Sequence, residues 1–181
     1  MNKVMKELFN TGLYLLVVLL ITYLVITFVG QRTEVEGESM EATLSNGDNL
    51  IVDKLTYKFS DPKRYDIIVF PFKYQENTYY IKRIIGMPGE TIQIDDAGRI
   101  YINGEVLEEG YGREIIRAEN VGIAAKPIIL GEDEYFVMGD NRNNSSDSRM
   151  EIIGNIHRED IVGRAWLRIW PFSKFGVLEH Q

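Results

Sequence analysis

The feature that most constrains this chain is an uncharged apolar run near its N-terminus. It extends from Leu8 to Val29 and is dominated by leucine, valine and isoleucine. About 20 helical residues are needed to cross the hydrocarbon core of a bilayer. The polar residues at 10–12 weaken the start of the run, so its firmly apolar part is 13–29. We therefore expect one transmembrane helix, followed by a single globular domain of ordinary size.

A cleavable signal peptide is the alternative interpretation of this run. Such a peptide ends at small residues, typically Ala-x-Ala, but the first alanine of the chain is Ala42. The run therefore favours a retained signal anchor. Lys3 and Lys6 precede it and place the N-terminus in the cytoplasm, whereas the single Arg32 on the other side is followed by three glutamates. The expected organisation is a cytoplasmic segment 1–7, an anchor 8–30 and an extracytoplasmic domain 31–181.

The composition of the chain excludes several classes of function. Its net charge is -7, and the acidic excess lies entirely after the anchor, which argues against binding to a nucleic-acid backbone. The absence of cysteine removes disulfides, thiolate metal sites and cysteine nucleophiles. The only histidines are His157 and His180, so we expect no histidine-based metal site and no metal at all.

After the anchor, the pattern changes to short β-rich segments separated by turn residues. Asn103-Gly104 between two such segments is a strong hairpin signal. We therefore predict a mainly β fold, an antiparallel sheet or barrel-like domain behind one helix, in which 91–130 is an inserted β-ribbon and loop region. The predicted strands are Asn49–Lys54, Tyr65–Phe70, Tyr79–Ile85, Thr91–Ile94, Ile100–Ile102, Glu105–Leu107, Tyr135–Met138 and Ile161–Trp170.

Ser39 is the first residue that could carry chemistry. It lies in the segment Gly37–Leu44, shortly after the anchor. A serine hydroxyl is a poor nucleophile at neutral pH unless a base lies within hydrogen-bond reach and donors face the oxyanion that forms on attack. By itself, Ser39 is an ordinary loop serine.

Lys82 is a candidate for that base. Strand alternation places Tyr80, Lys82 and Ile84 on one face of the predicted strand. Burial between an aromatic and an aliphatic side chain would lower the pKa of the lysine, and a neutral lysine can act as a general base. The alternative is a surface lysine whose ammonium group reaches solvent, and the local sequence does not decide between the two.

The third segment of interest is Gly139–Arg149, which contains hydroxyls, carboxylates and arginines at close spacing. Its composition fits a plain surface loop. However, it directly follows the predicted strand Tyr135–Met138, and loops held by a rigid scaffold often carry functional groups.

Together these segments resemble the type I signal peptidases, or leader peptidases, which are membrane-bound serine/lysine proteases. The closing Trp170-Pro171-Phe172 is similar to the smaller, Gram-positive-type members. Each segment alone is a weak signal, whereas four in order behind a single anchor form a specific one. The matching segments are Gly37–Leu44, Tyr65–Phe70, Tyr80–Glu90 and Gly139–Arg149.

The resemblance implies a role for each matching residue. Ser39 would be the nucleophile, Lys82 the general base and Ser145 the residue that hydrogen-bonds and orients the lysine. Asp140 would pair with Arg83, and Asp147 and Arg149 would be supporting ionic groups. The residues expected to contact substrate are Met40, Tyr80, Ile81, Val35 and Leu44.

The resemblance also implies the setting in which the protein works. It predicts an enzyme in the cell membrane that needs no metal and no other cofactor. Its expected partners are the signal peptides of secreted pre-proteins, membrane lipid and the export translocon, with no nucleic acid.

Two positions depart from the family pattern. Ala42 stands where the family usually has proline, which would stiffen the turn after Ser39. Gly37 stands where some members have a serine whose hydroxyl donates to the oxyanion. Loss of one such donor costs about 2.7–4 kcal/mol. The oxyanion hole is therefore expected to use the Ser39 N–H and a second donor that the sequence does not identify.

Three other functions are compatible with parts of the pattern. A histidine-based serine protease would have to use His157, which has no triad-like context. A self-cleaving serine/lysine repressor would carry a DNA-binding domain in place of the anchor. A catalytically silent relative, acting as an anchored assembly factor or chaperone, should have lost Ser39 or Lys82, and both are present.

Overall fold

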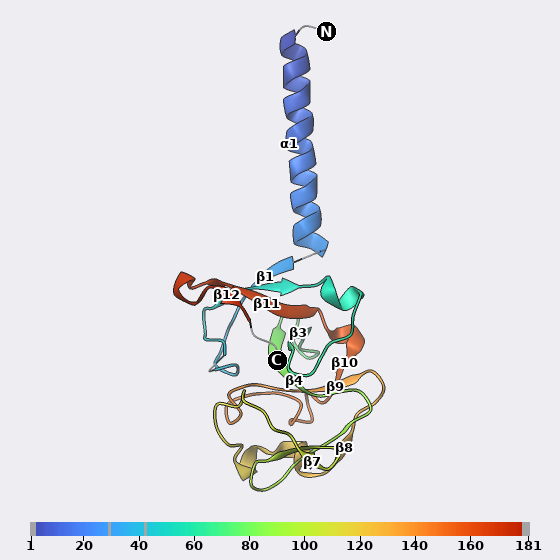
Figure 1. The fold of residues 1–181 in the computed structure, drawn as a ribbon, viewed down its shortest axis with the longest axis vertical. Helices are drawn as coiled ribbons and strands as arrows, with labels where there is room; N and C mark the ends of the chain where they lie inside the picture. Colours follow the sequence, from blue (N-terminus) through green and yellow to red (C-terminus); the bar gives the residue numbers. More distant parts are fainter. Residues whose placement is uncertain (1–2, 29, 42, 179–181) are drawn as a thin grey trace.

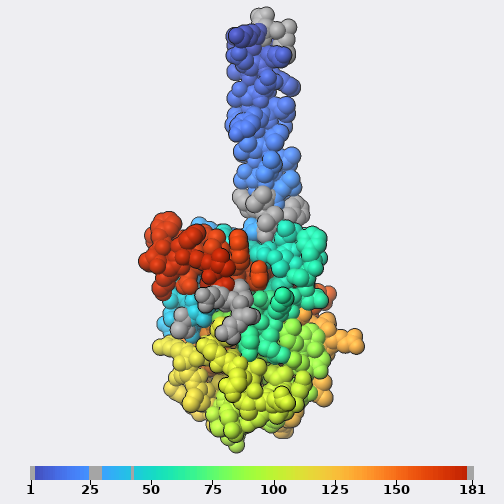
Figure 2. All heavy atoms as spheres, viewed as in Figure 1, coloured from blue at the N-terminus to red at the C-terminus, as the bar shows by residue number. Residues whose placement is uncertain are grey.

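A computed structural model describes residues 3–28, 30–41 and 43–178. Its one α-helix, α1 (Lys3–Phe28), stands clear of the remaining structure (Figures 1 and 2). The segment Lys3–Leu24 is long and apolar enough to cross a membrane, by length and composition. The helix begins five residues before the apolar run. Val29, Ala42 and His180 lie outside the described residues.

The main body of the domain is an antiparallel sheet of eight strands. Its order is β1-β2-β11-β3-β4-β9-β10, with β12 pairing with β11. The fold is therefore mainly β, as predicted, behind one N-terminal apolar helix. The strands of this sheet are β1 (Gly30–Glu34), β2 (Asn49–Asp53), β3 (Ile67–Pro71), β4 (Tyr79–Gly86), β9 (Glu134–Met138), β10 (Ile156–His157), β11 (Gly163–Trp170) and β12 (Gly176–Val177).

A second, four-stranded sheet is inserted between β4 and β9, at the end of the domain far from α1 (Figure 1). Isoleucines of this sheet share a core with Phe136 and Met138 of β9, which fixes the insertion on the main body. Its strands, in spatial order, are β7 (Glu105–Val106), β6 (Ile100–Ile102), β5 (Thr91–Ile94) and β8 (Ile128–Ile129).

Single-turn 3₁₀ helices make up part of the connections. Two of them lie within the stretch 110–127, for which no regular structure was expected. The five are η1 (Thr56–Lys58), η2 (Ala118–Asn120), η3 (Gly122–Ala125), η4 (Arg158–Asp160) and η5 (Phe172–Lys174).

All eight predicted strands are present, and their ends agree with the structure to within two residues. The prediction missed β1, β8, β10 and β12. β1 has the polar sequence Gly-Gln-Arg-Thr-Glu, and the other three are two residues long, so none shows an alternating apolar pattern. β1 is held by pairing with β2 rather than by its own β propensity.

The central strands β3 and β4 are covered on both sides. Because side chains alternate along a strand, β3 sends Ile67 to one apolar cluster and Ile68 to another. β4 likewise contributes Ile81 to the first cluster and Ile84 to the second. A polar side chain in the middle of β4 is therefore withdrawn from water.

Candidate active site

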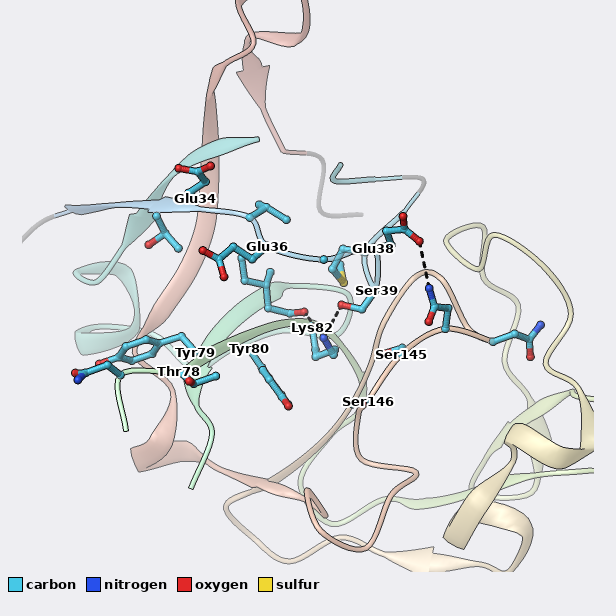
Figure 3. A pocket seen from close by; sticks show the side chains of 18 residues that line it. Glu34, Glu36, Glu38, Ser39, Thr78, Tyr79, Tyr80, Lys82, Ser145 and Ser146 are labelled. Atoms are coloured by element: carbon cyan, nitrogen blue, oxygen red, sulfur yellow. Dashed lines mark hydrogen bonds between the residues drawn. The ribbon is translucent and has the colours of Figure 1, made fainter. Parts of the chain in front are cut away.

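Ser39 and Lys82 meet in the structure. Lys82 extends from the middle of β4, and its Nζ lies 2.7 Å from the Oγ of Ser39 (Figure 3). The same nitrogen donates to the carbonyl oxygen of Ile81 at 3.0 Å. Lys82 is only 4% exposed, so the lysine is buried rather than a surface residue.

Burial changes the acidity of this lysine. Loss of hydration lowers the pKa of Lys82 from 10.5 to about 8, and the negative charges of Asp147 and Asp140 offset only part of this effect. Both hydrogen-bond partners of Nζ among the described residues, a hydroxyl and a carbonyl, are neutral. A substantial fraction of Lys82 is therefore neutral near pH 8 and can accept the proton of the Ser39 hydroxyl.

A tight turn presents Ser39. Gly37 has φ +92°, a conformation that favours glycine, and its N–H donates to the Oδ1 of Asn46 at 2.8 Å. The chain then enters a helical turn in which the Glu41 N–H donates to the Glu38 carbonyl oxygen at 3.1 Å. Any other residue at position 37 would be strained at this φ.

A cleft of about 610 Å³ surrounds the Ser39–Lys82 pair (Figure 3). Its walls come from 33–40, 77–82 and 143–146. Four of the five predicted substrate contacts line it: Val35, Met40, Tyr80 and Ile81. Tyr80 shares the Lys82 side of β4 as predicted, with its ring centroid 5.1 Å from Nζ.

Leu44 does not line the cleft, so the prediction of substrate contact was wrong for this residue. Its N–H donates to the Met40 carbonyl oxygen at 2.8 Å, and this turn directs the side chain into the core. Leu44 is fully buried in the cluster that contains Val35 and Met40. It supports the cleft from behind.

Arg83 and Asp140 form the predicted ion pair. The Nε and Nη2 of Arg83 donate to Oδ1 and Oδ2 of Asp140 at 2.9 and 2.8 Å, a bidentate geometry, and both side chains are fully buried. Nη1 donates to the Tyr65 carbonyl oxygen at 2.8 Å, and the guanidinium lies 3.7 Å from the Tyr111 ring centroid. The start of the 139–149 loop is thereby fixed to β4.

Asp147 and Arg149 hold the other end of this loop. Arg149 donates to both carboxylate oxygens of Asp147 at 2.8 Å. Asp147 also accepts from the Gly139 N–H at 3.0 Å, which ties the end of the loop back to its start. Among the described residues, neither side chain hydrogen-bonds to Ser39 or Lys82, so their observed bonds hold the loop rather than the pair itself.

Ser145 lines the cleft, but it does not make the expected hydrogen bond to Lys82. Its Oγ is buried and has no hydrogen-bond partner among the described residues. The hydroxyl instead lies against Gly139, where a Cβ atom would come within 2.3 Å of Ser145 Oγ and 2.4 Å of the Ser39 carbonyl oxygen. Glycine at position 139 leaves room for both oxygens, because any side chain there would clash with Ser145 Oγ and with the Ser39 carbonyl oxygen.

Two residues that were not predicted to belong to the site, Asn141 and Thr43, join the serine turn to the 139–149 loop. The Asn141 N–H donates to the Ser39 carbonyl oxygen at 3.0 Å, and its Nδ2 donates to the Glu38 carbonyl oxygen at 3.1 Å. Thr43 Oγ1 donates to Oδ2 of Asp140 at 2.5 Å. Both residues lie within segments that the resemblance had marked, but nothing in the pattern assigned them a partner.

His157 lies outside the cleft. It belongs to β10, and its Nδ1 is 3.2 Å from Oδ2 of Asp133. This position leaves the histidine-based mechanism without its base. In the part of the chain that the structure describes, no group of three or more histidine or acidic residues is arranged to hold a metal ion.

Comparison with known proteins places the chain in a family. The model of the family described as "Signal peptidase, peptidase S26" matches residues 8–170. A signal peptidase I from Leptolyngbya laminosa is 42% identical over 159 residues, covering 84% of this chain and 74% of the relative. Signal peptidase I P from Bacillus subtilis subsp. natto is 38% identical over 165 residues, covering 88% of both chains. A crystal structure of a signal peptidase I from Enterococcus faecalis has 33% identity and a TM-score of 0.47, covering 58% of this chain and 97% of the other. The chain thus belongs to the signal peptidase, peptidase S26, family.

Proposed function

We propose that this protein is a membrane-anchored serine endopeptidase that removes N-terminal signal peptides from exported pre-proteins. The observation that carries the proposal is the 2.7 Å contact between Ser39 Oγ and Lys82 Nζ inside a cleft, with the pKa of Lys82 lowered to about 8. Family membership supports the substrate class, because the matched relatives are named signal peptidase I.

In the first half of the reaction, Ser39 Oγ attacks the scissile carbonyl carbon of the substrate. Neutral Lys82 takes the hydroxyl proton as the new C–O bond forms. The Ser39 N–H donates to the oxyanion of the tetrahedral intermediate. The resulting Lys82 ammonium protonates the leaving amine, the C–N bond breaks and an acyl-enzyme ester remains on Ser39.

In the second half, water hydrolyses the ester. Lys82, neutral again, takes a proton from the attacking water and then returns it to Ser39 Oγ as the ester bond breaks. Each proton taken by Lys82 is returned within the same half of the reaction. Ser39 and Lys82 thus account for the nucleophile and the proton transfers of both steps.

The substrate is expected to bind as an extended segment. β1 is an edge strand of the main sheet, and the cleft runs between 33–36 and 79–82. An extended peptide can add its backbone hydrogen bonds to such an edge. Val35 and Ile81 are apolar, and shallow pockets beside them would accept the small side chains that precede signal cleavage sites.

The apolar helix α1 is proposed to anchor the enzyme, with the N-terminus in the cytoplasm and the catalytic domain outside it. Signal cleavage sites emerge at the membrane surface, so tethering raises the effective concentration of enzyme there. Membrane lipid and the export translocon are the partners that this arrangement would bring near the cleft.

The test is cleavage of a pre-secretory protein by the detergent-solubilised full chain, with the product N-terminus located by mass spectrometry. We expect wild type and His157→Ala to cut after the signal peptide, and Ser39→Ala and Lys82→Ala to be inactive. Equal cleavage by wild type and either dyad variant would disprove the serine/lysine mechanism. An inactive wild type with several pre-proteins would favour the silent assembly factor.

A further inference from the structure

We propose that Asn141 is a positioning residue that aims the Ser39 N–H at the oxyanion. The proposal rests on the function proposed above and deepens it. It concerns the oxyanion hole, which lacks a side-chain donor at position 37 because that residue is glycine.

Asn141 holds the backbone on both sides of the Ser39 Cα. Its side-chain Nδ2 donates to the Glu38 carbonyl oxygen at 3.1 Å, and its own N–H donates to the Ser39 carbonyl oxygen at 3.0 Å. One residue therefore fixes two successive peptide units, Glu38–Ser39 and Ser39–Met40.

Fixing a carbonyl also fixes the N–H of the same peptide unit. The unit is planar and trans, so its C=O and N–H point in opposite directions. The Glu38 carbonyl points toward Asn141, and the Ser39 N–H must point away from it. Within the described residues, this N–H has no hydrogen-bond partner, so it is free to donate to the oxyanion that forms when Ser39 Oγ attacks the substrate carbonyl.

Asn141 is itself held rigidly. It is 4% exposed, and its carbonyl oxygen accepts from the Asn144 N–H at 3.0 Å. The preceding residue, Asp140, is fixed to Arg83 by the buried bidentate pair. The serine turn on the other side is held by the hydrogen bonds from the Gly37 N–H to Asn46 and from the Glu41 N–H to the Glu38 carbonyl oxygen, and Asn141 joins this turn to the 139–149 loop.

A purely structural staple between two loops is the competing interpretation. It predicts a loss of stability with a general loss of activity. A positioning role predicts a lower kcat with little change in KM, because the oxyanion exists only in the transition state. It also predicts no change in the pH dependence, because Asn141 is not among the hydrogen-bond partners of Lys82.

The experiment compares Asn141→Ala and Asn141→Asp with Asn155→Ala in the full chain. Asn155 also donates one side-chain hydrogen bond, from Nδ2 to Glu134 at 2.8 Å, but it does not line the cleft. The aspartate variant keeps the size and the backbone N–H of residue 141 but replaces the donor with an acceptor. Melting temperature, kcat, KM, the pH profile and the affinity for a substrate-like peptide aldehyde are measured for each.

We expect both Asn141 variants to lose about 10- to 100-fold in kcat, since a misplaced catalytic group costs up to about 10²-fold. Their affinity for the aldehyde, which forms a hemiacetal oxyanion on Ser39, should fall in parallel. KM and the pH profile should stay as in wild type, and Asn155→Ala should keep wild-type kinetics.

Wild-type kcat in both folded Asn141 variants would overturn the proposal, as would a loss confined to KM or a shift in the pH profile. If Asn155→Ala lost as much kcat as the Asn141 variants at the same melting temperature as theirs, the role of Asn141 would be in stability alone. An inactive wild type would instead refute the proposed function, so the two failures are distinguishable.

Discussion

Each side of β4 buries one basic side chain, and the two side chains differ in whether a carboxylate pairs with them. Lys82 and Arg83 are adjacent, so their side chains leave the strand on opposite faces. Both are at most 4% exposed. Arg83 has a bidentate carboxylate partner in Asp140, whereas the partners of Lys82 within hydrogen-bond distance, among the residues described, are a hydroxyl and a carbonyl.

This difference shows how one strand can supply both a brace and a base. A buried guanidinium that is fully paired stays charged and fixes the loop that carries Asp140. A buried ammonium without a carboxylate partner loses hydration that two neutral hydrogen-bond partners and the more distant charges of Asp147 and Asp140 replace only in part, so the pKa of Lys82 falls to about 8. In the proposed mechanism, the energetic cost of burying the unpaired ammonium is what makes Lys82 a base near neutral pH.

Breaking the paired side should cause the largest change in stability. Arg83→Met leaves the Asp140 carboxylate buried without its partner, which typically costs about 3–5 kcal/mol in the free energy of unfolding. Urea denaturation of the variant measures this loss.

The matched control is the double variant Arg83→Met/Asp140→Leu, which removes both charges. Much of the lost stability should return, because well-packed apolar groups often replace a buried pair at little cost. A single variant as stable as wild type would show that Asp140 finds a new partner and that the pair is no brace.

Removing the unpaired cation, Lys82, should raise the free energy of unfolding rather than lower it. Lys82→Met is expected to abolish cleavage and to stabilise the fold at pH 7. The folded-state pKa is about 8 and the ordinary value is 10.5, so the penalty for burying the charge is about 3 kcal/mol at about 1.4 kcal/mol per pKa unit.

The pH dependence of this gain follows from proton linkage. Below pH 8 both the folded and the unfolded wild type bind the proton, so the penalty is fully present. Between pH 8 and 10.5 the unfolded state binds more protons, so the stability of wild type rises toward that of Lys82→Met. A variant less stable than wild type at pH 7 would contradict the burial of an unpaired charge.

The activity of wild type should report the same pKa. Only neutral Lys82 can accept the Ser39 proton, so kcat/KM should fall about tenfold for each pH unit below about 8 and level off above it. A profile of kcat/KM against pH with a pre-protein substrate measures this acidic limb, the fall in activity below about pH 8. Arg83→Lys, if folded, should keep this limb, because it alters the other side of β4. A limb near 10.5 would show that Lys82 is solvated in the working enzyme.

The sequence was sufficient to predict the alternating strands and the two side chains, Ser39 and Lys82, that the structure brings together in the cleft. Segments such as Tyr79–Gly86 have a two-residue period, and they were recognised within one or two residues. Ser39, Lys82 and the Arg83–Asp140 pair came from four segments in a fixed order. β1 and the two-residue strands β8, β10 and β12 were missed because tertiary pairing, rather than local pattern, forms them.

The contacts within the site could not be predicted in the same way. Leu44 was placed in the cleft because it belongs to the serine segment, but one i→i+4 hydrogen bond directs it into the core. The Ser145 Oγ packs against Gly139 instead of reaching Lys82. The Asn141 side chain donates to the Glu38 carbonyl oxygen, and these two residues are 103 positions apart in the sequence. No local spacing in the sequence predicts such a contact.

The smallest expected effect concerns the aromatic cover of the braced side. The Arg83 guanidinium lies 3.7 Å from the centroid of the Tyr111 ring, which is itself 5.1 Å from the Tyr65 ring. A buried cation–π contact contributes about 0.5–2 kcal/mol. Tyr111→Leu should therefore lower the free energy of unfolding by about 1 kcal/mol, and Tyr111→Phe, which keeps the ring, should lose less. In a double-mutant cycle the Tyr111→Leu effect should shrink when Arg83 is already methionine. An undiminished effect would show that Tyr111 acts by packing alone. The acidic limb of the pH profile should not move in these variants, because Tyr111 lies against Arg83 on the side of β4 opposite Lys82.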